Sequence, residues 1–446
     1  MTATTELYMK PSVSVFWFRR DLRLEDNAGL YHALRSGSPV LPIFIFDRNI
    51  LDKLNDKADR RVEFIHTALV EMQAQLVGLG SSLEWFHNDP PGAWRQLLSN
   101  FTITGVFANE DYEPYARDRD ESVKRLLSEN GVVLYLFKDQ VIFSKEEVRK
   151  DDGQPYTVYT PYRRRWMARW NESRQSSYPT NEYHEHFYRR PARPLPPLEY
   201  FGFIGTGSPF PRKTLSEDLL AKYADQRDYP GIQGTSRLSV HLRFGTCSIR
   251  DLVRRASAAG GNYLNELIWR EFYQMILWHF PEVGKGKSFK PAYDWIRWRN
   301  KEDEFEKWRL GMTGYPIVDA GMRELNSTGF MHNRVRMIVA SFLTRHLLID
   351  WRWGEAWFAA KLLDFDLAAN NGGWQWAAGC GCDAAPYFRV FNPELQTRKF
   401  DLQRSYVSRW VPEFQSAGYP RPVVDHAFAR KRALEVYRQA LQRTTD

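Results

Sequence analysis

The sequence predicts two domains of different class: an N-terminal α/β domain with a doubly wound parallel sheet, and a C-terminal domain that is almost all helical. Short apolar runs alternate with amphipathic stretches over the first third of the chain. Residues 189–212 are rich in proline and glycine, and beyond residue 210 helical periodicity dominates. We therefore expect domains over 1–138 and 213–446, joined by a long linker over 139–212.

The strands of the first domain are predicted from five short apolar runs, at 12–18, 39–46, 82–87, 104–110 and 131–137. Between these runs, 60–76 and 117–130 carry the apolar spacing of amphipathic helices. Such alternation implies parallel strands with helices on both faces. The first run is followed by FRRDLRLEDNAGL rather than a glycine fingerprint, so neither a dinucleotide-binding turn nor a P-loop is expected.

Helices of the second domain are predicted from their periodicity at 216–229, 264–280, 318–330, 331–350, 354–370 and 426–443. The segment NNGGWQWAAG, from Asn370 to Gly379, fits neither a helical nor a strand pattern. Of the 16 tryptophans in the chain, 11 lie between Trp269 and Trp410. Because each buried indole N–H needs a partner, so many tryptophans indicate a role beyond filling the core.

Composition limits the class of protein. Hydrophobic residues make up 43% and charged residues 26% of the chain, which is typical of a globular protein. We expect a soluble cytoplasmic protein with structural thiols, because the start lacks a signal peptide and only Cys247, Cys380 and Cys382 are present. His184 and His186 lie in the linker without nearby ligand residues, so no metal is predicted. The net charge of +8 suits a polyanionic partner.

One face of the helix predicted at 264–280 carries an unusual set of side chains. Its members recur at three- and four-residue spacing and are Glu266, Trp269, Arg270 and Tyr273. A solvated helix face would keep the two charges but would not need two aromatic rings beside them. The set is typical of a pocket that recognises a flat ligand with polar edges, with the indole as a stacking surface.

Two further stretches carry candidate binding residues. In MHNRVRM, Asn333 and Met337 share a helical face, and asparagine offers the donor and acceptor that a base edge requires. His332 alone is interpreted as a structural residue. After Gly234, hydroxyl and basic side chains leading into a helix suit either an anion cradle or an ordinary cap, the residues being Thr235, Ser236, Arg237 and Ser239.

Two carboxylates precede the NNGGWQW segment. Asp364 and Asp366 could form an acid–base pair, ligate a metal, accept hydrogen bonds from a bound ligand, or pair with Arg336. The residues by themselves leave these four interpretations open.

From VFWFRRDLRLEDNAGL to FNPELQTRKFD, the chain resembles the photolyase/cryptochrome flavoproteins, and most of all the cyclobutane pyrimidine dimer (CPD) photolyases. The resemblance covers nearly the whole chain and implies that the helical domain binds FAD. It also implies that the FAD-contacting positions are Tyr223, Thr235, Ser236, Arg237, Leu238, Ser239, Arg336, Asp364, Asp366 and Asn370. Within this set, Arg336 is expected to pair with Asp364, and Asn370 to face flavin N5.

The same resemblance assigns the remaining site residues. The dimer and its DNA would be bound by Glu266, Trp269, Arg270, Tyr273, Asn333, Arg334, Met337, Trp376 and Gln396. Catalysis is expected to involve Glu266, Asn333, Met337 and Asn370. Electrons would reach the flavin through Trp298, Trp351 and Trp374, with Trp308 as a further candidate. Relay through oxidisable indoles would account for the excess of tryptophan.

The activity implied is light-driven repair of UV-damaged DNA by a monomeric enzyme. Reduced FAD (FADH⁻) would pass an electron to a flipped-out dimer, the cyclobutane ring would open, and the electron would return. Glu266 would stabilise the radical anion by hydrogen bonding, while Trp269 and Trp376 would sandwich the flipped bases. The basic surplus would contact phosphates.

Three alternatives differ in class. A (6-4) photolyase would need histidines where Asn333 and Met337 stand. Plant cryptochromes, which are photoreceptors, carry aspartate at the place of Asn370, and cryptochromes often extend further beyond the flavin domain. A helical DNA-binding module without catalysis would leave the aspartates and tryptophans unexplained.

A second, light-harvesting chromophore is possible, with a deazaflavin or flavin favoured over folate. In one folate-binding branch, an Asn-Glu pair follows the glutamate of the loop after the fourth strand. Here that loop reads NEDYEPYARDRD, so Tyr115 and Ala116 occupy the matching places.

Overall fold

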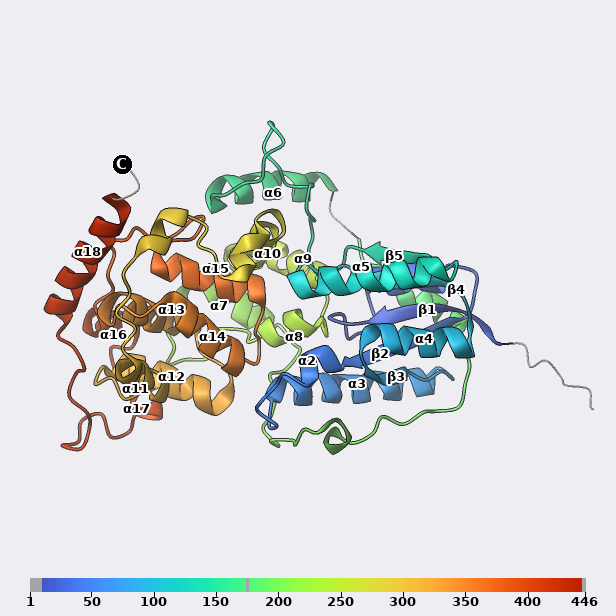
Figure 1. Cartoon of the computed structure of the whole chain (residues 1–446), viewed down its shortest axis with the longest axis horizontal. Helices are drawn as coiled ribbons and strands as arrows, with labels where there is room; N and C mark the ends of the chain where they lie inside the picture. Colours follow the sequence, from blue (N-terminus) through green and yellow to red (C-terminus); the bar gives the residue numbers. More distant parts are fainter. Residues whose placement is uncertain (1–9, 174–175, 443–446) are drawn as a thin grey trace, which may run out of the picture. The chain divides into compact units, whose positions relative to one another are not determined.

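The computed structural model describes residues 10–173 and 176–442, whose packing forms two compact units (Figure 1). The first unit contains residues 10–142, 176–213 and 241–252, and the second contains 143–173, 214–240 and 253–442. The chain thus passes between the units several times. The predicted domains over 1–138 and 213–446 were each one continuous stretch of the chain, whereas each compact unit is built from three stretches. The predicted domain limits stay a prediction.

The first unit contains a five-stranded sheet, in which all neighbouring strands are parallel and the order is β3-β2-β1-β4-β5. The strands are β1 (Ser12–Phe18), β2 (Val40–Asp47), β3 (Glu84–Asn88), β4 (Thr102–Asn109) and β5 (Leu134–Phe137). All five predicted strands are confirmed. The strand order reverses direction between β1 and β4, which is where doubly wound sheets place ligands.

Helices pack against this sheet. They are α1 (Ala28–Leu34), α2 (Arg48–Leu51), α3 (Arg60–Gly78), α4 (Pro90–Asn100) and α5 (Pro114–Glu129). The sequence patterns predict α3 and α5 but miss α1 and α4. α4 does carry start signals, since the side chain of Asp89 caps it and Pro90 and Pro91 open it. Val15 and Trp17 on one face of β1 and Phe16 and Phe18 on the other are all buried, as expected for a sheet covered on both faces.

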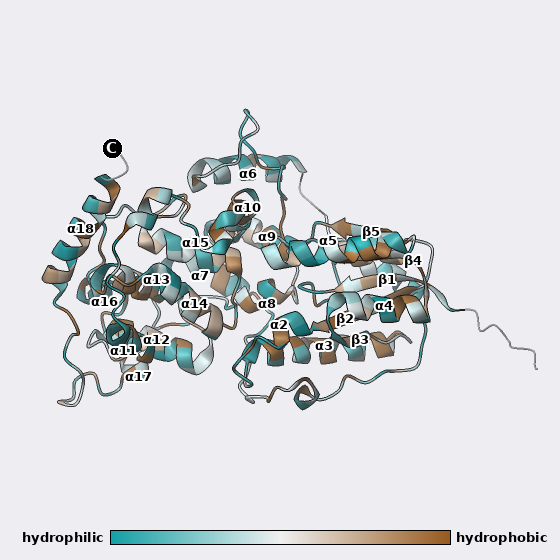
Figure 2. Cartoon of the chain, viewed as in Figure 1, coloured by the Kyte–Doolittle hydropathy of each residue, from teal (hydrophilic) through white to brown (hydrophobic). Residues whose placement is uncertain are grey.

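The second unit is helical, as predicted. Its helices are α6 (Tyr159–Ser173), α7 (Glu217–Gln226), α10 (Asn262–His279), α11 (Glu302–Leu310), α12 (Pro316–Thr328), α13 (Asn333–Ser341), α14 (Trp351–Lys361), α15 (Leu367–Ala378), α16 (Pro393–Phe400), α17 (Ser405–Trp410) and α18 (His426–Gln442). Short α8 (Ser239–Phe244) and α9 (Ile249–Ala258) include residues of both units. Short 3₁₀-helices lie at Thr180–His186 and Leu198–Phe201 in the first unit and at Pro281–Lys285 and Pro291–Trp295 in the second. α18 alternates apolar and polar residues along its length (Figure 2).

Three predicted features of the second unit are wrong in detail. The helix expected over 331–350 begins at Asn333 and ends in a π-helical turn, Phe342–His346. The helix expected over 354–370 is two helices, because the chain leaves α14 at Leu362 and restarts at Asp366, whose carboxylate caps α15. The NNGGWQW segment, which fits no regular pattern, lies within α15.

The N-cap of α7 in the helical unit makes a contribution to stability that can be tested directly. Ser216 is the N-cap of α7, and its hydroxyl accepts a hydrogen bond from the backbone N–H of Leu219. Ser216→Ala is expected to destabilise the protein by about 1 kcal/mol, whereas Ser216→Asp should be close to neutral because aspartate also caps helices. Urea unfolding would measure both variants. Equal losses would show that the cap bond does not contribute.

Candidate functional site

The predicted face of α10 is present, and two of its members have partners from other elements. The Arg227 guanidinium, just after α7, donates to the Glu266 carboxylate at 2.6 Å (Nη1 to Oε1). The Trp269 indole stacks on the ring of Tyr159 from α6, with centroids 3.7 Å apart and planes 8° from parallel. One face of the indole is therefore covered by Tyr159, so that only the opposite face could take part in the predicted stacking.

The charge state of Glu266 reflects two opposing effects. Burial raises the pKa of its carboxyl group, and the ion pair with Arg227 is the largest influence that lowers it. The same burial raises the pKa of Tyr159, Tyr223 and Tyr273, so these phenols stay neutral.

The helix α13 presents its first residues beside the same ion pairs. Arg334 donates to Asp228 at 2.7 Å and lies 3.9 Å from the sulfur of Met337 (Nη2 to Oδ1 and Nη1 to Sδ). His332 caps the helix by accepting from the backbone N–H of Arg334, and burial lowers its pKa to about 4. A neutral capping histidine is a structural residue, which agrees with the interpretation from the sequence.

Arg227 and Asp228 are consecutive residues. Through them the end of α7 is joined to Glu266 on α10 and to Arg334 on α13. The two helices that carry the predicted dimer-binding residues are thus tied to one point of the chain.

The loop before α8 has an unusual backbone. Arg237 has φ 53°, in the left-handed region, and its guanidinium lies 4.4 Å from the centre of the Phe330 ring. The hydroxyl of Ser236 is hydrogen-bonded to that of Tyr263 at 2.8 Å and accepts from the backbone N–H of Leu238. Thr235 lies in the same loop, and Ser239 is the first residue of α8. Hydroxyls, backbone N–H groups and an exposed guanidinium form a donor set that suits phosphates.

The predicted pair between Arg336 and Asp364 is confirmed, with Nη2 at 2.9 Å and 3.1 Å from the two carboxylate oxygens. Asp366 accepts from the backbone N–H of Ala369 as the cap of α15. Asn370, one turn later, donates to the Glu355 carboxylate at 2.8 Å (Nδ2 to Oε1). The acidic residues here act as hydrogen-bond acceptors. Among the described residues, no group of three His, Cys, Asp or Glu side chains could hold a metal.

The two tryptophans of α15 have different surroundings. Trp374 is only 2% exposed and packs edge-on against Trp308 and Phe358, with ring centres 6.1 Å and 5.0 Å away. Its indole N–H has no hydrogen-bond partner among the described residues. Trp376 is half-buried, with Phe391 at 6.5 Å. The spacing of two residues thus sends one ring into the core and one toward the surface.

The other members of the predicted relay lie in the same helical unit. Trp351 opens α14 and is 2% exposed, whereas Trp298 is half-buried against Tyr437 with ring centres 6.0 Å apart. Gln396 lies on α16, and its buried side-chain oxygen has no partner among the described residues. Arg270 is half-buried on α10.

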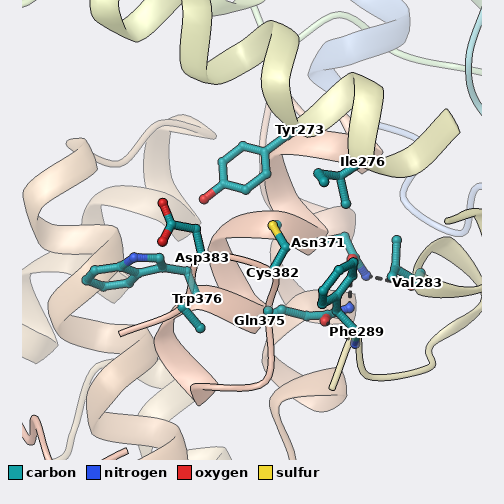
Figure 3. A pocket seen from close by; sticks show the side chains of 12 residues that line it. Tyr273, Ile276, Val283, Phe289, Asn371, Gln375, Trp376, Cys382 and Asp383 are labelled. Atoms are coloured by element: carbon teal, nitrogen blue, oxygen red, sulfur yellow. Dashed lines mark hydrogen bonds between the residues drawn. The ribbon is translucent and has the colours of Figure 1, made fainter. Parts of the chain in front are cut away.

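A pocket of about 280 Å³ lies beside Trp376 and Tyr273 (Figure 3). In Figure 3, Asp383 lies between these two rings, Cys382 lies beside Tyr273, and Phe289 lies at the other end of the pocket, near Asn371 and Gln375. Burial raises the pKa of the Cys382 thiol to about 11 and that of Cys380 to about 12. Both thiols therefore stay protonated, as expected of structural cysteines.

Sequence reasoning missed four residues of this site: Tyr159, Arg227, Asp228 and Glu355. Each contacts a predicted site residue from a distant part of the sequence. The sequence does place Arg227 one helical turn after Tyr223, a predicted site residue, and this spacing could have indicated Arg227 as a candidate. Nothing local indicates that it faces Glu266.

Comparison with known proteins completes the description. Residues 14–180 match a family model described as DNA photolyase, and residues 263–418 match the FAD binding domain of DNA photolyase. The deoxyribodipyrimidine photo-lyase of Synechococcus sp. is 37% identical over 95% of this chain and 96% of its own. A class III photolyase from Agrobacterium tumefaciens has a TM-score of 0.83 at 33% identity, covering 99% of this chain and 100% of its own. An archaeal photolyase from Sulfolobus tokodaii, solved with two FAD molecules, has a TM-score of 0.79 at 32% identity, covering 96% and 99%.

Proposed function

This chain belongs to the DNA photolyase family, and from that premise we propose that it is a deoxyribodipyrimidine photo-lyase, which splits cyclobutane pyrimidine dimers in DNA with light. The observation that carries the proposal is the joining of α10 and α13 by Arg227 and Asp228. It brings together the helices that carry Glu266 and Asn333, the side chains suited to pyrimidine edges.

The donor set of the helical unit fits FAD. Ser236, Arg237 and neighbouring backbone N–H groups would hold its phosphates, while Asp364 and Asn370 would contact the ring system. When bound in reduced form, FAD supplies the light-driven electron that opens the cyclobutane ring and then accepts it back. Asp364 is held in place for this contact by Arg336, and Asn370 by Glu355. The reduced state of the flavin and each of these contacts are part of the proposal.

The residues around the dimer have separate tasks. The open face of Trp269 would stack on a flipped base, which offsets part of the free energy needed to unstack it. Trp376 would contact the second base, and Glu266 would hydrogen-bond the pyrimidine edges. The surplus of basic residues supports UV-damaged DNA as the partner. Among the described residues, no helix has the length and apolar character needed to cross a membrane. A monomeric, cytoplasmic state stays a prediction from the sequence.

A second chromophore in the first unit, a deazaflavin or flavin rather than folate, also stays a proposal. A small pocket lies at the switch between β1 and β4, and its lining is polar and charged, including Arg20, Asn109 and Asp111. Charged groups of the protein pair across it, including Arg20 with Asp111 at 3.0 Å and Arg19 with Asp120. Tyr115, at the folate-discriminating place, donates to Asp47. No step is assigned to a second chromophore.

The function is tested with oligonucleotides that carry either a CPD or a (6-4) lesion, incubated with the FAD-loaded protein in light or darkness. We expect loss of the CPD in light only and no change in the (6-4) lesion, since Asn333 and Met337 replace the histidines of that branch. Photoreduction of FAD without dimer splitting would support a cryptochrome-type photoreceptor instead.

Glu266 gives the sharpest mutational test of this function. Glu266→Ala is expected to lower the number of dimers split per absorbed photon several-fold, because a hydrogen bond to the charged ring is lost. DNA affinity should change less, since phosphate contacts provide most of it. The control is Glu217→Ala, an exposed carboxylate of α7. An unchanged yield in Glu266→Ala would remove the proposed role.

A further inference from the structure

The pairing of Arg227 with Glu266 has a geometry that leaves part of the carboxylate open. Arg227 reaches Oε1 of Glu266, and within residues 10–173 and 176–442 no hydrogen bond is made to Oε2. The Arg227 side chain is 28% exposed and that of Glu266 is 31% exposed. Both groups can therefore be reached by a ligand that enters from solvent.

Arg227 is the principal cation facing Glu266. The other charged or titratable groups around the carboxylate are Asp228 beside Arg227, Arg334 from α13, Tyr223 from α7, Tyr159 from α6 and Tyr273 from α10 itself. Arg334 is already engaged by Asp228. Burial raises the pKa of Glu266, and Arg227 provides the main opposing influence. Arg227 is thus the strongest influence that favours the ionised form of Glu266 in the DNA-free protein.

We propose that Arg227 is a positioning residue that keeps Glu266 ionised in the DNA-free protein, and that binding of dimer-containing DNA transfers one proton from solvent to Glu266. The inference rests on the proposed function. DNA brings phosphates to a half-exposed guanidinium, and a phosphate competes with the carboxylate for it. The dimer removes the remaining water from Glu266 at the same time.

Protonation of Glu266 changes the hydrogen bonds that its side chain can form with the dimer. A carboxylate that loses both its water and its counter-ion becomes protonated, because the charged form is strongly disfavoured by burial. The resulting carboxylic acid can donate a hydrogen bond to a pyrimidine carbonyl oxygen, which an ionised carboxylate cannot do. A neutral acid also avoids placing a second negative charge beside the ring that receives the electron. The balance is one solvent proton added to one Glu266 oxygen, with no bond of the DNA altered.

The proposal is tested by calorimetry in darkness. A CPD oligonucleotide is titrated into the FAD-loaded protein in buffers of equal pH and different ionisation enthalpy, and the dependence of the heat on that enthalpy counts the protons taken up. The wild-type protein is expected to take up about one proton in the pH range between the free and bound pKa values of Glu266. Because the complex holds the extra proton, its affinity should fall as pH rises through that range.

Four variants separate the contributions. Glu266→Gln should abolish the uptake. Arg227→Gln should reduce the proton uptake, because without the guanidinium the pKa of Glu266 rises in the DNA-free protein and more of the carboxyl groups are protonated before DNA binds. Arg227→Lys, which keeps the positive charge, should retain most of the uptake. Lys222→Gln, which removes an exposed cation of α7 paired with Asp218, should leave it unchanged.

The outcomes that overturn the inference are specific. They are selective binding of CPD DNA by the wild type without proton uptake, or an uptake in Glu266→Gln equal to that of the wild type. A wild-type protein that does not prefer CPD DNA to undamaged DNA, and does not repair it in light, would instead overturn the proposed function.

Discussion

Replacing Trp374 by phenylalanine is expected to abolish nearly all photoreduction of bound, oxidised FAD, while repair by chemically reduced enzyme is largely retained. Indole is far more easily oxidised than phenyl, so an electron relay is interrupted although an aromatic ring remains. Trp374 is buried against Trp308 and Phe358, and its N–H makes no hydrogen bond with the described residues. Phenylalanine therefore breaks no side-chain hydrogen bond, and the space left by the smaller ring lowers the stability of the core without removing the aromatic packing.

The measurement is the loss of oxidised flavin absorbance under blue light with an external reductant. Trp410→Phe is the matched control, because Trp410 is a half-buried tryptophan of the same core outside the predicted relay. Trp351→Phe should behave like Trp374→Phe. Trp308→Phe should slow photoreduction less than Trp374→Phe, because Trp308 is only a further candidate beside the three predicted relay tryptophans. Normal photoreduction in Trp374→Phe would exclude it from the relay.

Gly372→Ala is expected to destabilise the protein by about 1–3 kcal/mol, the usual effect of overpacking. A Cβ atom at this position would lie 2.3 Å from the ring of Tyr273, closer than packed atoms approach. The ring belongs to α10, so relief of the clash would move α10 and α15 apart. Because these helices carry Glu266 and Trp376, DNA repair should decline together with stability.

The neighbouring glycine is the control for this prediction. A Cβ atom at Gly373 would have no atom within 4 Å, although both glycines lie in α15. Gly373→Ala should stabilise the protein by about 0.5–1 kcal/mol, since alanine is a better helix former. Thermal unfolding would compare the two variants. Equal shifts of Tm in the same direction would contradict the assignment of Gly372 as the contact point.

Periodicity and short motifs predicted the elements but not all their limits. The five strands can be recognised because each is a short apolar run, even β5 at the edge of the sheet, where Tyr135 and Leu136 are exposed. The NNGGWQW segment was misjudged because two glycines and two indoles obscure the helical pattern, whereas the cap at Asp366 and the packing of α15 on α10 and α14 stabilise a helix. Gly372 makes room for Tyr273.

The sequence by itself determined the fold class, the family and the candidate residues, because these follow from local patterns and from motifs that can be read directly in the amino-acid sequence. The tertiary structure alone decided which partners those residues have. Arg227 faces Glu266 across 39 positions, and Tyr159 covers Trp269 from another helix. Such contacts depend on how helices pack, and packing sets the burial and charge that govern the protonation of Glu266. Neither this burial nor this charge can be derived from the local spacing of residues in the sequence.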